Sequence, residues 1–186
     1  GSTFDRVNKR GYVVCGTNGE FPGFSREDWN MEDGSRWEGF DVDICRAIAA
    51  AMFGDAEAIE FTIVNGKTRF EFLIDGSIDI LSAATTYTFT RNVAKKLEFM
   101  PTTFYDGQGF IVRKTLGVSS AKQMEGARIC FSGTGTAAKN IADFMELHGI
   151  SYIPVAVKST EKTKNVYKRG DCDMYGTDRS GLASNR

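Results

Sequence analysis

Short apolar runs alternate with stretches of helical spacing along the first half of the chain. Three apolar or β-branched runs end in turn-forming residues, which is typical of buried strands: 12–17, 58–64 and 78–82. Apolar residues recur at helical spacing over 41–53 and 67–75, and Gly54 and Gly76 end these predicted helices. Strands that alternate with helices predict right-handed βαβ units and a parallel sheet.

The same alternation begins again in the second half of the chain. Its predicted strands cover 109–113, 127–131, 152–157 and 171–175. Its predicted helices cover 119–124, 137–147 and 159–169. We therefore expect an α/β fold with two lobes, at 1–104 and 110–186, joined by a glycine-containing hinge at 105–109.

The segments that follow the predicted strands are where a binding site is expected. In open α/β sheets, ligands bind beyond the carboxyl ends of the strands. The first such segment, 21–37, has scattered glycine, proline and charged residues without a period, so it is predicted to be a long loop. The other segments are 83–91, 133–136 and 177–179.

Composition and charge narrow the function classes. With 41% hydrophobic and 25% charged residues, the 186-residue chain is expected to be globular. Its 23 Lys and Arg nearly balance its 24 Asp and Glu, and no basic run stands out, so a nucleic-acid partner is not expected. No stretch approaches the roughly 20 apolar residues that a membrane-spanning helix needs.

The metal-binding residue types do not form a metal motif. The four cysteines include no CxxC pair, which disfavours zinc. The single histidine, His148, lies in a helical stretch without acidic or thiol neighbours at ligand spacing, so we interpret it as a surface or helix-end residue. We expect neither a metal nor another cofactor.

Arg91 is the leading candidate for an anion-binding residue. Threonines precede it at positions 85, 86, 88 and 90. A planar guanidinium with hydroxyl donors beside it is what a carboxylate accepts best. In the alternative interpretation, Arg91 caps a helix or forms a surface ion pair, and the threonines favour a strand.

Two further features of the second half complete a site for a zwitterion. The turn GTGT at 133–136 opens a helix, so its backbone amides and the helix dipole are expected to attract an anion. It lacks the lysine and spacing of a P-loop, which favours a small carboxylate over a triphosphate. Asp178, after the last predicted strand, can accept from an ammonium group. The alternatives are an ordinary strand-to-helix turn and a solvated Asp.

Five segments carry a resemblance to a known family. They read YVVCGTNGEFPGFS, WEGFDVDICRAIAAAMFGDA, DILSAATTYTFTR, FYDGQGFIVRK and CDMYGTDRSGLA. They closely resemble the extracytoplasmic polar amino-acid-binding proteins of bacterial ABC importers, particularly the general L-amino-acid-binding branch. The similarity covers residues 11–186, and GFDVDIC and TDRSGLA are its most specific parts.

The resemblance implies a type II periplasmic-binding-protein fold, which closes on a small L-amino acid in a cleft between its two lobes. Arg91 and Thr86 would hold the α-carboxylate, and Asp178 would accept from the α-ammonium group. The remaining implied contacts are second-lobe partners of the carboxylate at Thr134 or Thr136, and residues of the side-chain pocket at Asn18 and Phe21. Ala84 stands where the family commonly has a polar residue, so a hydrogen bond to the ligand is either missing or supplied by backbone.

The resemblance also implies a periplasmic or secreted location, a membrane ABC permease as partner and no catalysis. Two alternatives stay open: a cyclohexadienyl dehydratase-like enzyme, with Glu20 as the one nominated general acid, and a structural or sensory derivative that binds no ligand. Relatives continue beyond the last strand and return to the first lobe. A homodimer that completes this lobe is therefore a further expectation.

The four cysteines agree with an exported protein. Cys15 could pair with Cys45 within the first lobe, and Cys130 with Cys172 within the second. Three pairings are formally possible, and the sequence does not choose among them. Four buried free thiols are the alternative.

Overall fold

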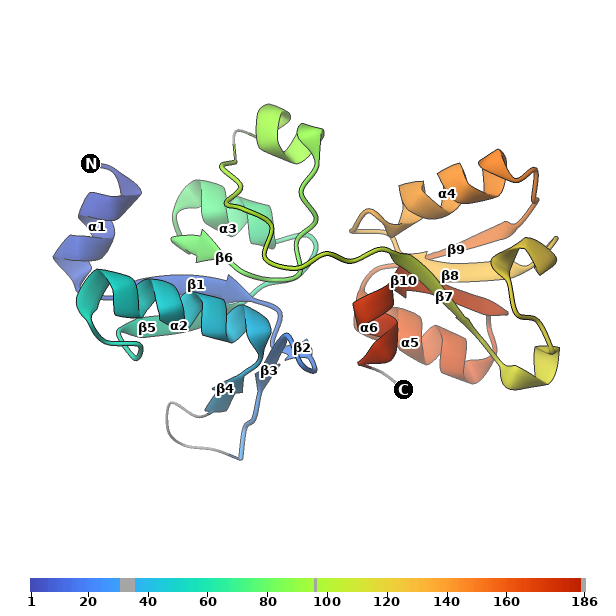
Figure 1. Ribbon diagram of the computed structural model, residues 1–186, viewed down its shortest axis with the longest axis horizontal. Coiled ribbons are helices and arrows are strands. Elements are labelled where there is room, and N and C mark those ends of the chain that lie inside the picture. The colour runs from blue at the N-terminus through green and yellow to red at the C-terminus, as the bar shows by residue number, and fades with distance from the viewer. Residues whose placement is uncertain (31–35, 96, 185–186) are drawn as a thin grey trace. The chain divides into compact units, whose positions relative to one another are not determined.

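The computed structural model describes residues 1–30, 36–95 and 97–184. The chain forms two compact units, Gly1–Thr86 and Tyr87–Arg186, and each has a sheet of its own (Figure 1). Each unit also has its own hydrophobic core. The predicted lobe limits at 104 and 110, with a hinge between them, stay predictions.

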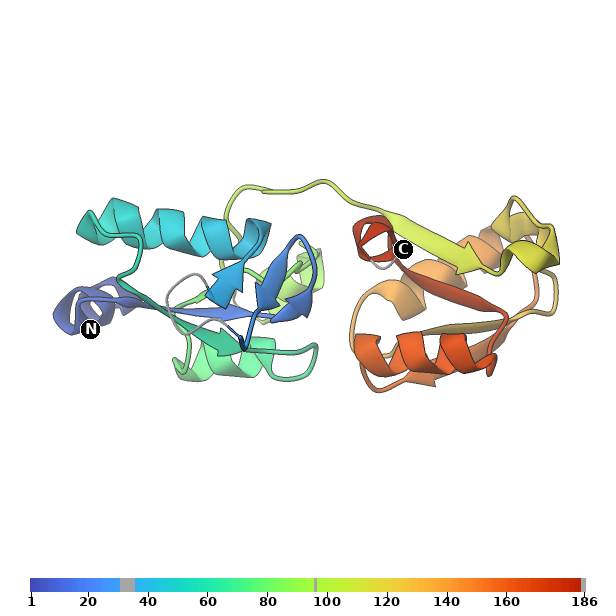
Figure 2. The same cartoon turned by 90° about the horizontal axis from the view of Figure 1, so that it is seen from below.

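The main sheet of the first unit is parallel, as the sequence predicts. Its central strand β1 (Val13–Thr17) pairs with β5 (Ile59–Ile63) on one side and with β6 (Ile80–Leu81) on the other. Parallel neighbours need crossover connections, which helices α2 (Phe40–Phe53) and α3 (Arg69–Asp75) supply. Figure 2 shows these two helices on opposite faces of the sheet.

Alternation along β1 gives each face of this sheet its own cluster of buried side chains. Val13 packs with Ala49 of α2, whereas Val14 packs against the cluster that contains Val64 and Ile78. Full burial of such an aliphatic side chain stabilises the fold by about 1.5–3 kcal/mol. Both faces therefore hold β1 in place and fix where its carboxyl end lies.

The first unit also contains elements that the hydrophobic pattern did not indicate. Helix α1 (Thr3–Arg10) precedes β1 and begins with a capping box formed by Ser2 and Asp5. The segment at 21–37, predicted as a loop, is in part an antiparallel sheet of β2 (Glu20–Phe21), β3 (Ser25–Glu27) and β4 (Trp37–Glu38). The loop prediction was wrong there because strands of two or three residues are too short to show a period. Residues 31–35 of that prediction lie outside the described part of the chain.

The sheet of the second unit has the order β7-β10-β8-β9. Its strands are β7 (Gln108–Val112), β8 (Arg128–Ser132), β9 (Ile153–Val157) and β10 (Met174–Asp178). β8, β9 and β10 run parallel, as predicted, but β7 runs antiparallel to β10, so the prediction was wrong for this strand. A local apolar run does not encode strand direction.

The helices of the second unit are mostly where their spacing predicts them. α4 (Ala137–Leu147) and α5 (Thr160–Arg169) confirm two predictions, and α6 (Arg179–Ala183) follows β10. The predicted helix at 119–124 is a short 3₁₀ turn, Ala121–Gln123, and a further 3₁₀ turn covers Lys114–Leu116. A third short element, the π-helix Thr90–Ala94, lies near the start of this unit.

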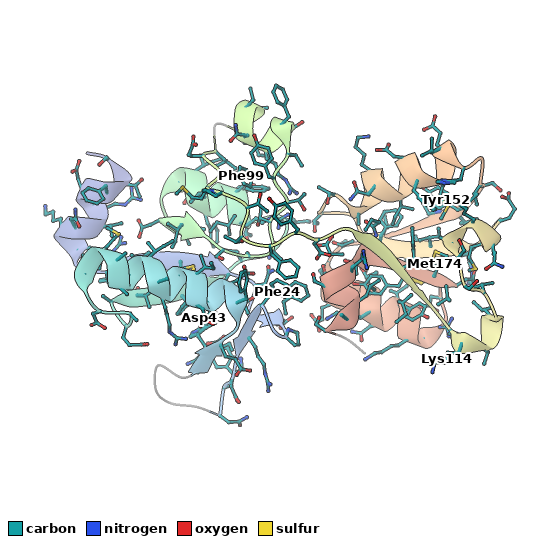
Figure 3. The ribbon with its side chains drawn as sticks, in the orientation of Figure 1. Phe24, Asp43, Phe99, Lys114, Tyr152 and Met174 are labelled. Carbon is teal, nitrogen blue, oxygen red and sulfur yellow. A yellow bond between two sulfur atoms is a disulfide. The ribbon has the colours of Figure 1, made fainter. Side chains whose placement is uncertain are left out.

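Neighbouring residues of β8 belong to separate clusters. Ile129 packs in a cluster with Ile141 of α4 and with Met174 of β10, which is labelled in Figure 3. Cys130 packs in the cluster that contains Val166 of α5. Because successive strand residues point to opposite faces, α4 and α5 cover opposite sides of the sheet.

Two disulfides confirm the cysteine pairings that agreed with an exported protein. Cys15 of β1 is bonded to Cys45 of α2, and Cys130 of β8 is bonded to Cys172, just before β10. All four residues are fully buried. The alternative of four free thiols was therefore wrong, and each unit has a covalent link between its sheet and a second segment.

Two further sequence observations have structural counterparts. His148 is the residue at the end of α4, and its Nδ1 lies 2.8 Å from the carbonyl oxygen of Phe144, so the helix-end interpretation is confirmed. Among the described residues, no helix is both long enough and apolar enough to cross a membrane.

Candidate functional site

The carboxyl ends of β1 and β6 bring two predicted site segments together in the first unit. These strands are parallel neighbours, so the residues that follow them meet at one edge of the sheet. Asn18 follows β1, and its Nδ2 donates to the carbonyl oxygen of Ala83, 3.2 Å away. The structure thus places the predicted residues Asn18 and Ala84 on adjoining segments.

The turn after β6 has an unusual backbone. Ala84 has φ of 46°, and it is the one described residue other than glycine with a positive φ. Its N–H donates to Oδ2 of Asp41, 2.9 Å away, so this amide is engaged within the protein. The side chain of Thr85 donates to Ala83 O (3.3 Å) and accepts from the buried Arg69 at the same distance. Thr86, the next residue, is exposed.

Aromatic side chains surround the hairpin formed by β2 and β3. The ring of Phe21 stacks on that of Phe24, with centroids 4.8 Å apart, and Phe24 meets Phe40 edge to face. Phe24, labelled in Figure 3, lies in the turn that joins the two strands. The buried hydroxyl of Ser25 accepts from the amide of Gly19, which anchors the hairpin to the residues that follow β1. Phe21 is therefore held in the same unit as Asn18.

Arg91 lies in the π-helix of the second unit and is 8% exposed. This burial does not fit the alternative of a surface ion pair. Burial lowers the pKa of the Arg91 guanidinium, and the negative charge of Asp178 opposes that shift. Arg91 and Asp178, predicted as the anion and ammonium contacts, are therefore within electrostatic reach of each other in one unit. Arg91 is nevertheless a cation at neutral pH, because an arginine guanidinium is not deprotonated in proteins.

Asp178 is the last residue of β10 and the N-cap of α6, which begins at Arg179. The sequence pattern placed the last strand at 171–175, three residues too early. Cys172 and Asp173 lie before β10, where they make a disulfide with Cys130 and an ion pair with Arg128. The correction moves Asp178 from a following loop to the carboxyl end of the strand itself, where its position is fixed by pairing with β7.

The GTGT turn joins β8 to α4 as predicted, but its amides are partly used. Gly133 N–H donates to Val157 O (2.9 Å), and Thr134 N–H donates to Ser132 Oγ (3.5 Å). Two of the amides that were expected to attract an anion therefore already have acceptors within the protein. Thr134 Oγ1 and Ser132 Oγ are 3.0 Å apart. Thr136 precedes the first residue of α4, and no side chain of the described residues caps that helix start.

The candidate residues thus fall into two sets. The first unit holds Asn18, Phe21, Ala84 and Thr86, and the second unit holds Arg91, Thr134, Thr136 and Asp178. Sequence reasoning missed Asp41, Arg69 and Ser82, which support the turn after β6. The signal available for Asp41 was an acidic residue in the first turn of a predicted helix, and that pattern does not show whether the carboxylate is buried.

Other chemistries find less support in the described residues. Groups of three or more His, Cys, Asp or Glu side chains that could hold a metal ion are absent from the part of the chain that the structure describes. Glu20, the candidate general acid, is exposed on β2, opposite Arg26 of β3. The arrangement offers hydrogen bonds and charges for binding.

Comparison with known proteins gives a consistent picture. The profile of the bacterial extracellular solute-binding proteins, family 3, matches residues 13–175. The chain is 42% identical over 185 residues to the glutamate/glutamine/aspartate/asparagine-binding protein of Rhodobacter capsulatus, covering 100% of this chain and 54% of that protein. It is also 42% identical to the general L-amino acid-binding periplasmic protein of Rhizobium johnstonii, covering 100% of this chain and 53% of that protein.

A solved structure shares the fold closely. It is an ABC transporter periplasmic binding protein from Brucella ovis with glutathione bound, 38% identical, with a TM-score of 0.91. The match covers 98% of this chain and 56% of that chain. The chain therefore spans about half the length of the relatives it matches, and the predicted type II periplasmic-binding-protein fold is confirmed for that half.

Proposed function

Because the chain belongs to the bacterial extracellular solute-binding proteins of family 3, we propose that it binds a free L-amino acid reversibly for uptake by an ABC transporter. The observation that carries the proposal is the buried Arg91 with Asp178 within electrostatic reach. An amino acid carries a carboxylate and an ammonium group on one carbon. A fixed cation and a fixed anion near each other are complementary to that pair.

In this proposal, the two sets of residues have different tasks. Arg91 and Thr86 bind the α-carboxylate, helped by the hydroxyl of Thr134 or Thr136. Asp178 accepts from the α-ammonium group. Asn18 and Phe21 contact the ligand's side chain, and Ala84 contributes shape to that pocket.

The proposed location and partner follow from the same membership. Two buried disulfides are typical of proteins that fold in an oxidising compartment, which supports a periplasmic or secreted location. A membrane ABC permease is the proposed receiver of the amino acid. Two of the relatives above are named as amino-acid-binding proteins, and this naming supports binding without catalysis.

A thermal-shift screen tests the proposal on the purified chain. A ligand that binds only the folded state stabilises it by RT ln(1 + [L]/Kd) and thereby raises the melting temperature. The screen contains the twenty amino acids, glutathione and prephenate. We expect a dose-dependent rise with at least one L-amino acid and none with its D-enantiomer at equal concentration. No rise with any amino acid contradicts the proposal, and turnover of prephenate favours the enzymatic alternative.

A further inference from the structure

The turn after β6 adopts a conformation that its own sequence does not favour. A left-handed φ places the Cβ of Ala84 close to backbone atoms, which is why glycine normally occupies such positions. Residues held in sparsely populated backbone regions persist when the surrounding structure fixes them, and they cluster at binding sites. The question is therefore which group fixes Ala84.

Asp41 contacts this turn at two points. Its Oδ1 accepts from the hydroxyl of Ser82 (3.1 Å), and its Oδ2 accepts from the N–H of Ala84 (2.9 Å). These two donors lie on either side of Ala83, so one carboxylate bridges the residues that flank the bend. A bidentate acceptor fixes both position and direction more tightly than a single hydrogen bond.

Other hydrogen bonds of the bend involve the amide of Ser82 and the carbonyl of Ala83, whereas the amide of Ala84 donates to Asp41. The amide of Ser82 donates to Gly16 O of β1 (3.0 Å), which continues the sheet. The carbonyl of Ala83 accepts from Asn18 Nδ2 (3.2 Å) and from Thr85 Oγ1 (3.3 Å).

Asp41 is itself held rigidly. It is 5% exposed, and its N–H donates to Phe24 O (2.8 Å), in the turn between β2 and β3. It occupies the first turn of the 14-residue helix α2, where the helix dipole favours a negative charge. Burial raises the pKa of Asp41, and the hydrogen bonds from Ser82 and Ala84 oppose that shift. Asp41 therefore connects the hairpin of β2 and β3, through its N–H, with the bend after β6, through its carboxylate.

We propose that Asp41 is a positioning residue, which holds residues 82–86 in their ligand-binding conformation without touching the ligand. The proposal rests on the proposed function, because Thr86 and Ala84 are the residues it would position for an amino acid. Specificity and affinity then depend on a buried side chain at the start of α2. Asp43, labelled in Figure 3, lies in the same helical turn but is exposed.

The test combines three variants with one control. Asp41→Ala removes both acceptors, and we expect the affinity for the amino acid to fall about tenfold or more. Ala84→Gly in that background lets the bend adopt positive φ without a holder, and we expect most of the affinity to return. Asp41→Asn keeps an acceptor for Ala84 and a donor for Ser82, so it should bind within about threefold of the natural chain. The control Asp43→Ala removes the same charge from the same turn and should bind normally.

A readout without ligand separates this proposal from the proposed function. Amide hydrogen exchange at Ala84 should be slow in the natural chain and in Asp41→Asn, and fast in Asp41→Ala. If the natural chain binds no amino acid, the proposed function fails and the exchange data still decide the role of Asp41. Fast exchange at Ala84 in the natural chain, or Asp41→Ala with unchanged affinity, overturns the proposal. So does a loss of affinity that Ala84→Gly does not restore. If Asp41→Ala does not fold, Asp41→Asn decides: a loss of affinity of about tenfold or more in that variant overturns the proposal.

Discussion

Asp79 is expected to be the polar side chain whose removal costs the first unit the most stability. Its side chain is 1% exposed and binds three donors: Nη2 of Arg6 at 3.0 Å, Nη2 of Arg10, and the N–H of Val14 at 2.8 Å. These bonds tie α1 and β1 to the residue that precedes β6. The change to test is Asp79→Ala.

The magnitude follows from what each donor loses. The amide of Val14 is left without its acceptor at a buried strand, which costs about 1–3 kcal/mol. Removing one partner of a fully buried ion pair costs about 3–5 kcal/mol, but the side chains of Arg6 and Arg10 are 45% and 24% exposed and can be rehydrated. We therefore expect a total loss of about 2–4 kcal/mol in the free energy of unfolding.

Urea denaturation followed by circular dichroism measures this loss at pH 7. The matched control is Asp171→Ala, whose partner Arg169 is 62% exposed, and such surface pairs contribute about 0–1 kcal/mol. A loss in Asp79→Ala no larger than that of the control refutes the reasoning.

The same residue predicts a pH dependence. Burial alone would raise the pKa of Asp79, but hydrogen bonds from Val14, Arg6 and Arg10 outweigh it and hold the pKa below its ordinary value of 3.8. A carboxyl group with a lowered folded-state pKa contributes stability above its unfolded pKa, and this contribution is lost as the pH falls through the folded value. The gap in stability between the natural chain and Asp79→Ala should therefore narrow below about pH 4. A constant gap down to pH 2.5 would contradict this assignment.

Two further predictions concern covalent and steric constraints. Replacing both Cys130 and Cys172 by Ser removes a disulfide between residues 42 positions apart, and we expect the free energy of unfolding to fall by about 3–4 kcal/mol. Urea denaturation without reductant measures this loss. A loss under about 1 kcal/mol would show that the disulfide adds little stability. A Cβ at Gly16 would lie 2.5 Å from Cδ1 of Ile78, so Gly16→Ala should lower the free energy of unfolding by about 1–3 kcal/mol. The control Gly135→Ala has open space at its Cβ and should lower it by less than half as much. Equal melting temperatures of the two variants would contradict the packing argument.

The sequence predicts elements well where their own periodicity is strong. The helix α2 could be predicted because its apolar residues recur over 14 residues and Gly54 adopts the left-handed conformation that ends it. The strands β2, β3 and β4 could not, because each has only two or three residues and is stabilised by its neighbours. The antiparallel direction of β7 is likewise a property of the whole sheet.

The candidate site divides in the same way. The chemistry of Arg91 and Asp178 is visible in the residue types, so both could be selected as charged candidates from the sequence. The burial of Arg91 and its electrostatic reach to Asp178 depend on residues far apart in the chain. Asp41 was missed for the same reason, since 41 positions separate it from the hydroxyl of Ser82 that it binds. A local sequence pattern predicts neither the Arg91–Asp178 interaction nor the Asp41–Ser82 hydrogen bond.

Titration calorimetry with Arg91→Ala tests the central claim most directly. The titrant is the amino acid that gives the largest thermal shift, and the control is Arg169→Ala, which removes an exposed guanidinium. Truncating one partner of a buried charged pair costs about 2–5 kcal/mol, so the Kd should rise by about 30-fold or more in Arg91→Ala and stay unchanged in the control. An Arg91→Ala variant that is folded and binds the amino acid with the natural Kd would contradict the account.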